Sequence, residues 1–197
     1  MATLRSSALS WAFRLHPTHH RSRLQKCRID RHLCPAQAEN WPRNHPATRA
    51  MLRIFKQLKR NGHASLLADL TVKPGRAATV IECFGLKTCV PNLHTSLAFR
   101  LGLPLLPATA LPLTDGTYRC HFLDPMEASD YPSIDTMTQA VWDRFEPQIR
   151  QHPECWMWMY KHWRYLPGPE HDSRYPEYAN PNRQFREMLP VAQLPPP

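Results

Sequence analysis

The apolar residues between residues 40 and 153 change their spacing from one segment to the next, and this change most constrains the fold. Helical spacing of about 3.6 residues predicts helices within residues 45–62, 91–102 and 133–153. Short apolar or alternating runs between them predict strands within residues 64–70, 79–85, 103–113 and 118–125. Alternating helices and strands predict an α/β fold, in which helices flank a sheet.

The expected helices carry recognisable end signals. Gly62 and Gly102 each follow the last apolar residue of a helical segment, where glycine commonly ends a helix. Pro147 lies inside the third helical segment and predicts a kink or a division there, because proline lacks the backbone N–H. The run 64–70 reads as a buried strand that ends at Asp69.

The two ends of the chain differ from its middle. Residues 1–39 are basic, with Asp30 the one acidic residue before Glu39, and show no sustained period. Three interpretations are open for them: a disordered basic arm, an amphipathic presequence, or a non-native stretch translated in the wrong frame. Residues 167–197 are rich in proline and predict an irregular tail. The folded domain is therefore expected to span residues 40–166.

The charge balance limits the classes of partner. The formal net charge of +9 favours an anionic partner: nucleic acid, phospholipid head groups or an acidic substrate. No apolar run reaches the roughly 18–20 residues of a spanning helix, so we expect contact with a membrane surface and no crossing. The six cysteines form no C-x-x-C pair, which favours a reducing cytosolic setting and no metal site.

Residues 152–165, HPECWMWMYKHWRY, concentrate aromatic and basic side chains. Rings beside cations suit the bilayer interface, where one end of the ring is apolar and the other meets phosphates. The competing interpretation is that Trp156 and Trp158 pack against the sheet. We expect four residues at a membrane interface: Trp158, Lys161, Trp163 and Arg164.

Five segments in a fixed order carry a family resemblance: TRAMLRIFKQLKRNGHASLLADL, ECFG, LHTSLAFRLGLPLLPATAL, DGTYRCHF and IRQHPECWMWMYKHWRY. Together, over about residues 47–166, they resemble the bacterial lipid A biosynthesis lauroyl/myristoyl acyltransferase family, within the wider lysophospholipid acyltransferase group. The resemblance implies part of an acyltransferase-type sheet whose N-terminal portion is missing or replaced. It places four residues near the substrate: Arg49, Asp69, Phe84 and Gly85.

The resemblance also implies a reaction. The family transfers an acyl chain from a carrier donor, such as acyl carrier protein or acyl-CoA, to the hydroxyl of a lipid acceptor. We accordingly expect a peripheral protein at the cytoplasmic face of the inner membrane, with no metal and no further cofactor. In the closing signature, this chain has Tyr160 where histidine is usual and Cys155 in place of glutamine.

The catalytic motif that the resemblance implies is absent from the 197 residues. It pairs a histidine base with an acid five positions on, because the base must deprotonate the hydroxyl and the carboxylate orients the imidazole. None of the eleven histidines has an acid there, and His63 and Asp69 are one residue too far apart. We therefore assign no catalytic residue and expect this chain to be inactive.

Two alternatives stay open beside an inactive acyltransferase-family protein. The first is a non-catalytic protein that binds the membrane surface, as a remnant of the family. The second is a basic nucleic-acid-binding protein, although no helix-turn-helix, zinc-finger or RNA-binding signature accompanies the charge.

Overall fold

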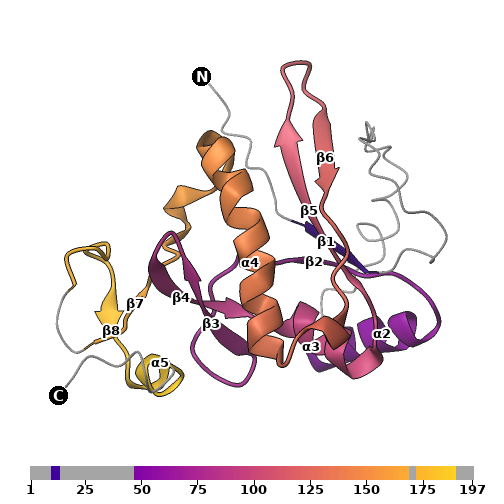
Figure 1. Cartoon of the computed structure of the whole chain (residues 1–197), viewed down its shortest axis with the longest axis horizontal. Helices are drawn as coiled ribbons and strands as arrows, with labels where there is room; N and C mark the ends of the chain where they lie inside the picture. Colours follow the sequence, from indigo (N-terminus) through magenta and orange to yellow (C-terminus); the bar gives the residue numbers. More distant parts are fainter. Residues whose placement is uncertain (1–9, 14–46, 169–171, 190–197) are drawn as a thin grey trace.

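The computed structural model describes residues 10–13, 47–168 and 172–189, which form a mixed α/β arrangement of helices and small sheets (Figure 1). The strands are β1 (Ser10–Phe13), β2 (Ser65–Leu67), β3 (Ala78–Cys83), β4 (Leu86–Pro91), β5 (Leu105–Pro112), β6 (Tyr118–Phe122), β7 (Tyr165–Leu166) and β8 (Asn180–Pro181). The α-helices are α2 (Ala47–Lys59), α3 (Leu93–Leu101), α4 (Ile134–Gln151) and α5 (Arg183–Glu187). Short 3-10 helices are η2 (Ala128–Asp130), η3 (Pro153–Cys155) and η4 (Trp158–Tyr160). The predicted α/β class is confirmed.

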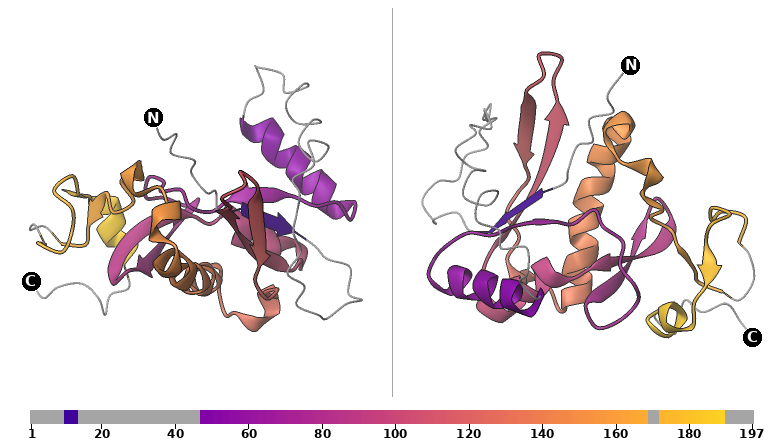
Figure 2. Two further views of the ribbon diagram at one scale, coloured as in Figure 1. Left: turned by 90° about the horizontal axis from the view of Figure 1, so that it is seen from above. Right: turned by 180° about the vertical axis from the view of Figure 1, so that it is seen from behind.

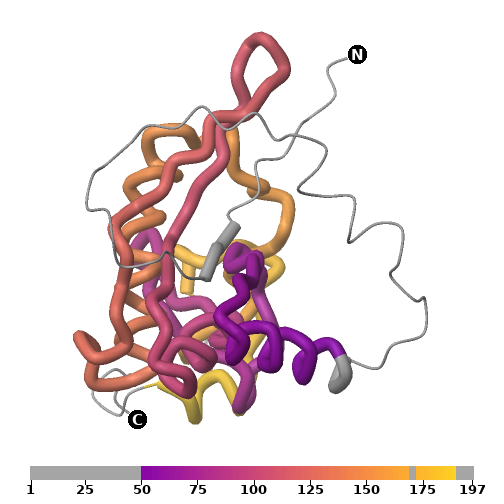
Figure 3. The backbone as a smooth tube through the Cα atoms, turned by 90° about the vertical axis from the view of Figure 1, so that its right-hand side faces the viewer, coloured from indigo at the N-terminus to yellow at the C-terminus, as the bar shows by residue number. Residues whose placement is uncertain are grey.

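The described strands form three separate sheets, whereas the sequence predicted one. The largest sheet has the order β2-β1-β5-β6, and all its neighbouring strands are antiparallel. Strands β3 and β4 form a hairpin of their own, and β7 pairs with β8 in parallel. In Figures 2 and 3, α2 and α4 lie on opposite sides of the four-stranded sheet, and the β5–β6 turn extends beyond the rest of the molecule.

Helix α4 occupies the centre of the described structure. Ser133 and Thr136 form a capping box at its start, which satisfies backbone N–H groups that lack partners within the helix. Its apolar side is fully buried, with Met137, Val141, Trp142, Phe145 and Ile149 in the main core.

The predicted division of α4 at Pro147 was wrong. The helix continues to Gln151, and Pro147 lies on its exposed side. The buried neighbours Phe145 and Ile149 anchor the turns before and after the proline, so tertiary packing outweighs the lost hydrogen bond.

The polar side of α4 covers the outer edge of β3. Gln139 acts like a peptide group: its Oε1 accepts the Glu82 N–H at 2.7 Å and its Nε2 donates to the Glu82 carbonyl at 2.9 Å. The Thr79 hydroxyl donates to Oδ1 of Asp135 on the same helix. These side chains satisfy backbone and hydroxyl groups where a further strand would otherwise pair, so the hairpin needs no third strand.

The strand predicted at 64–70 is shorter and less buried than expected. Strand β2 has three residues at an edge of its sheet, and Leu67 is 48% exposed because it lies on the same face as the exposed Ser65. Strand β4 was not predicted, since its turn, Phe84-Gly85, lacks the Asn-Gly or Asp-Gly signal of a tight hairpin. Helix α3 was predicted correctly, with Gly102 in the left-handed conformation at its end.

Parts of both predicted terminal segments belong to the described structure. Within residues 1–39, the structure describes Ser10–Phe13, as β1 between β2 and β5; Cys27 and Cys34 lie outside the described residues. Within residues 167–197, α5 buries Phe185 against Ala78 and Cys89 of the β3–β4 hairpin.

Candidate functional site

One of the predicted substrate residues, Arg49, lies away from Phe84 and Gly85. Arg49 belongs to α2, and its side chain is outside the described part of the structure. Asp69 follows β2 and is half-buried. Phe84 and Gly85 form the β3–β4 turn, and Figure 1 places this turn and α2 on opposite sides of α4. A substrate role for Arg49 and Asp69 stays a prediction.

The Phe84-Gly85 turn has an unusual backbone. Both residues have positive φ angles, 56° and 74°, as a type I′ hairpin turn requires. Glycine adopts this conformation freely, whereas phenylalanine does so rarely, at a cost of about 1–3 kcal/mol. Contacts from the surrounding structure must therefore hold Phe84 in place.

Glu146 on α4 supplies one of these contacts. Its Oε2 accepts the Phe84 N–H at 2.8 Å, and its Oε1 accepts from Nε and Nη2 of Arg150 at 2.9 and 2.6 Å. The Arg150 guanidinium lies 4.7 Å from the centre of the Phe84 ring. Burial acts to raise the pKa of Glu146, but the Phe84 N–H and Arg150 outweigh it and lower that pKa. The carboxylate is thus held in its charged form, which is the form that accepts both bonds.

The Phe84 ring belongs to an aromatic cluster, which we define as Phe84, Trp142, Trp156, Trp158, His162 and Trp163. Trp156 is its centre, with ring centroids 5.7 Å from Phe84, 6.5 Å from Trp142, 4.8 Å from Trp158 and 6.1 Å from Trp163. Most of these pairs are tilted or edge-to-face, the geometry that aromatic quadrupoles favour. The structure therefore brings the predicted substrate residue Phe84 against the predicted interface residues Trp158 and Trp163.

His162 is the buried polar member of the cluster. Its ring stacks on Trp156 at 4.2 Å, and its Nε2 lies 3.2 Å from the carbonyl of Met157, which accepts a hydrogen bond from it. Burial lowers the pKa of His162 to about 4, with Arg164 adding to this effect. His162 is therefore neutral near pH 7 and supplies no positive charge to a membrane or a phosphate.

Three consecutive apolar residues project from this cluster to the surface, and we call them the exposed ledge. Met157 is 42% exposed, Trp158 46% and Met159 82%. The indole N–H of Trp158 donates to the carbonyl of Pro153 at 2.6 Å, so its polar atom is satisfied within the protein. What the ledge offers outward is therefore mainly apolar surface.

Two predicted interface cations flank the exposed ledge. Lys161 adopts a left-handed backbone conformation at the end of η4, and its Nζ lies 5.6 Å from the centre of the Tyr178 ring. Arg164 donates from Nε to the Lys161 carbonyl at 3.0 Å and lies over the Tyr160 ring at 5.2 Å. Trp163, the fourth predicted interface residue, is only 8% exposed and packs inside the cluster. A membrane contact of Trp163 stays a prediction. The exposed surface in this region belongs to the ledge residues Met157, Trp158 and Met159.

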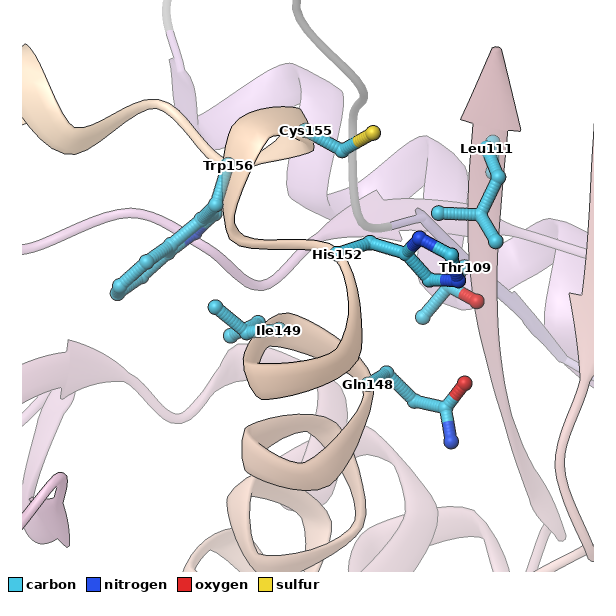
Figure 4. Close-up of a pocket in the computed structure, with 8 residues that line it drawn as sticks. Thr109, Leu111, Gln148, Ile149, His152, Cys155 and Trp156 are labelled. Carbon is cyan, nitrogen blue, oxygen red and sulfur yellow. The ribbon is translucent and has the colours of Figure 1, made fainter. Parts of the chain in front are cut away.

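A pocket lies beside the cluster, between the end of α4 and strand β5 (Figure 4). Figure 4 shows Gln148 and His152 pointing from the end of α4 toward β5, which carries Thr109 and Leu111. The lining residues are Thr109, Ala110, Leu111, Gln148, Ile149, His152, Cys155 and Trp156. No sequence pattern marks this pocket, because its residues come from segments about forty positions apart with no shared motif.

The lining residue His152 contacts a carboxylate beside the pocket. Nδ1 of His152 lies 3.5 Å from Oε1 of Glu154, two positions on in the sequence. The pKa of Glu154 is lowered, first by its own backbone N–H and also by His152. Across the pocket, Oε1 of Gln148 lies 3.3 Å from Nδ1 of His121, which is paired in register with Thr109.

The sequence profile of the bacterial lipid A biosynthesis acyltransferases matches residues 24–165, well over half of the chain. The chain belongs to this family. The matched region of the lipid A acyltransferase family includes the Phe84-Gly85 turn, the aromatic cluster and the exposed ledge. The matched region also begins at residue 24, inside the basic segment of residues 1–39. No curated protein matches the chain.

Membership of the lipid A acyltransferase family gives the remaining observations their context. No helix in the described part of the chain is long and apolar enough to cross a membrane. Within the same residues, no group of three or more His, Cys, Asp or Glu side chains is placed to hold a metal ion.

Proposed function

We propose that this chain is a peripheral membrane protein of the lipid A acyltransferase family, which binds the membrane surface through the exposed ledge and does not itself transfer acyl groups. The proposed location is the cytoplasmic face of the inner membrane. The observation that carries the proposal is the exposed ledge itself, three adjacent apolar side chains with Lys161 and Arg164 beside them.

The physical basis is the match between this surface and an anionic bilayer. Apolar side chains gain about 1.5–3 kcal/mol each when they leave water completely, and a cation near an anionic surface gains about 1 kcal/mol. The indole N–H of Trp158 is already bonded to Pro153, so its ring can enter the apolar side of the head-group region without leaving a donor unpaired. The Phe84 ring and Trp156 support the ledge from behind, so it needs little reordering on binding.

The residue inventory supports the proposed absence of acyl transfer. The family's reaction needs a histidine with an acid five positions on, and none of the eleven histidines in the 197 residues has one. We therefore propose the family's reactants, a lipid with a free hydroxyl and an acyl-carrier donor, as ligands of this chain. We do not propose them as substrates that this chain converts.

Vesicle sedimentation tests the membrane proposal. The full chain should bind vesicles that contain phosphatidylglycerol and bind phosphatidylcholine vesicles much less, and binding should weaken as salt increases. The double variant Trp158→Ala/Met159→Ser should lower the partition coefficient at least about tenfold. Leu52→Ser is the matched control, because Leu52 is an apolar residue of similar exposure on α2.

Two results would contradict the proposal. Equal loss of vesicle binding in Leu52→Ser and in the double variant would mean that the ledge is not the contact surface. Tighter binding to DNA than to phosphatidylglycerol vesicles at equal salt would favour the nucleic-acid alternative. The catalytic half of the proposal is tested by an assay with an acyl-carrier donor, in which turnover above a heat-inactivated sample would overturn it.

A further inference from the structure

The exposed ledge contains two methionines that are far more open to solvent than the methionines of the core. Met159 is 82% exposed, the highest value among the large apolar side chains that the structure describes, and Met157 is 42% exposed. Met126 and Met137, in contrast, are fully buried. Reagents in water can therefore reach the sulfur atoms of the ledge, whereas those of the core are shielded as long as the protein is folded.

A methionine thioether that meets a hydroperoxide becomes a sulfoxide. A lone pair of the sulfur attacks the outer peroxide oxygen, the O–O bond breaks, and an S–O bond forms. The sulfur is oxidised by two electrons, and the proton of the transferred oxygen passes to the departing alkoxide, which leaves as an alcohol. Hydrogen peroxide gives water in the same way. Methionine sulfoxide reductases, one for each epimer, reverse the change.

Oxidation would change the surface of the ledge strongly. The sulfoxide oxygen is polar and accepts hydrogen bonds from water, so its transfer to an apolar environment costs free energy, whereas transfer of a thioether does not. Met157 and Met159 are two of the three residues of the ledge, and their oxidation leaves Trp158 as its one apolar side chain.

The same change should leave the folded structure intact. The side chain of Met159 lies almost entirely in solvent, so its sulfoxide needs no buried space. Met157 accepts the hydrogen bond from His162 through its backbone carbonyl, which oxidation of the side chain does not alter. Affinity for a membrane can therefore fall without unfolding of the aromatic cluster.

We propose that Met157 and Met159 form an oxidation site, at which a hydroperoxide converts the thioethers to sulfoxides and so releases the chain from an anionic membrane. Met159 reacts first, because it is more exposed. The inference rests on the proposed membrane binding through the exposed ledge. It adds the chemical change by which that binding is lost and, through the reductases, regained.

Peptide mass spectrometry and vesicle sedimentation of the full chain test the proposal together. Dilute hydrogen peroxide is added, and the oxidised fraction of each methionine is followed over time. Met159 should be oxidised ahead of Met51, which is 38% exposed on α2, and well ahead of the buried Met126. Once Met157 and Met159 are both oxidised, the partition coefficient on phosphatidylglycerol vesicles should fall about tenfold, and the two reductases should restore it.

Two variants identify the methionines that cause the loss, each compared with its own untreated sample. The double variant Met157→Leu/Met159→Leu has an apolar ledge without sulfur, so peroxide should change its partition coefficient little. Met51→Leu is the matched control, and peroxide should weaken its binding as much as that of the wild type. An equal loss in the double variant would assign the effect to other residues, such as cysteines, and would overturn the proposal.

The untreated wild type separates a failure of this inference from a failure of the proposed function. If the untreated chain does not bind phosphatidylglycerol vesicles, the proposed function fails and this inference falls with it. If the untreated chain binds, and binds equally well with both ledge methionines oxidised, this inference alone fails. Two further results would overturn it: oxidation of Met51 ahead of Met159, and a lowered unfolding temperature of the oxidised protein, which would attribute the lost binding to unfolding.

Discussion

The backbone N–H of Phe84 donates a hydrogen bond of 2.8 Å to Oε2 of Glu146, which lies 62 positions later on α4. The bond joins the turn of the β3–β4 hairpin to the central helix. It holds a phenylalanine in a backbone conformation that few residues other than glycine adopt.

Removing this carboxylate should destabilise the protein. Glu146→Ala is expected to lower the free energy of unfolding by about 1–3 kcal/mol, because the Phe84 N–H loses its acceptor and Arg150 loses its partner. Urea denaturation measures the change. Glu187→Ala is the control, since Glu187 pairs with Arg183 at an exposed site and should change stability by less than about 1 kcal/mol. Equal losses in the two variants would show that the Glu146 contacts do not hold the turn.

The second turn residue should tolerate asparagine better than alanine. A Cβ at Gly85 would meet no atom within 4 Å, so the cost of substitution comes from its φ of 74° alone. Gly85→Ala is expected to lower the free energy of unfolding by about 1–2 kcal/mol, and Gly85→Asn by less, because asparagine enters the left-handed region more easily. Thermal unfolding of both variants decides this, and an alanine variant as stable as the asparagine variant would contradict it.

Stability should fall below neutral pH because of His162. Burial lowers its pKa to about 4 in the folded state, against about 6.5 in an unfolded chain. Between these values the unfolded chain binds more protons, so the free energy of unfolding should decrease as pH falls from about 6.5 to 4. His94, whose pKa burial also lowers to about 4, should contribute in the same direction.

The variant His162→Phe isolates the contribution of His162. Phenylalanine can keep the stack on Trp156 and has no proton to bind. The loss of stability between pH 7 and pH 4.5 in urea should therefore be smaller in this variant than in the wild type, and the contribution of His94 should remain. The control is His152→Phe, at a histidine whose side chain is 42% exposed. An unchanged pH dependence in His162→Phe would count against the assignment.

The tryptophans of the cluster should differ sharply in their effect on stability. Trp156→Ala is expected to cost about 3–5 kcal/mol, because Trp156 is the buried centre of the cluster. Trp158→Ala should cost much less, since about half of that side chain is already in water. Denaturation midpoints of the two variants provide the measurement. Similar losses would mean that Trp158 belongs to the core, as the competing interpretation of the sequence held for both residues.

Local sequence signals predicted the elements that carry their own period and end residue. Helix α3 with Gly102 and strand β5 are examples, since neither depends on a distant partner for its pattern. Strand β4 was not predicted, because the positive φ of Phe84 in its turn depends on contacts with Glu146 and with the neighbouring rings. These contacts come from distant parts of the chain, so no local sequence rule includes them. The same reason explains why the separation of the β3–β4 hairpin from the larger sheet was not predicted. Side chains of α4, such as Gln139, bond the edge of β3 where a neighbouring strand would otherwise pair.

The candidate site divides in the same way. The aromatic run drew attention to Trp158, Lys161 and Arg164, and composition alone was enough to find them. It could not tell that Trp163 turns inward while Met159 turns outward, because that depends on the 3-10 turns between them. The pocket that Thr109 and Trp156 line had no sequence signal, since its lining comes from β5 and from the end of α4 with the residues that follow it.

The hydrogen bonds between α4 and β3 also determine how the described structure opens over time. Asp135, Gln139 and Glu146 reach Thr79, Glu82 and Phe84 along most of the strand and its turn. The amide protons of Glu82 and Phe84 cannot exchange with solvent deuterium until these side chains release them. The turn should therefore exchange at the slow rate of the helix that holds it, and the hairpin and α4 should behave as one cooperative unit in time.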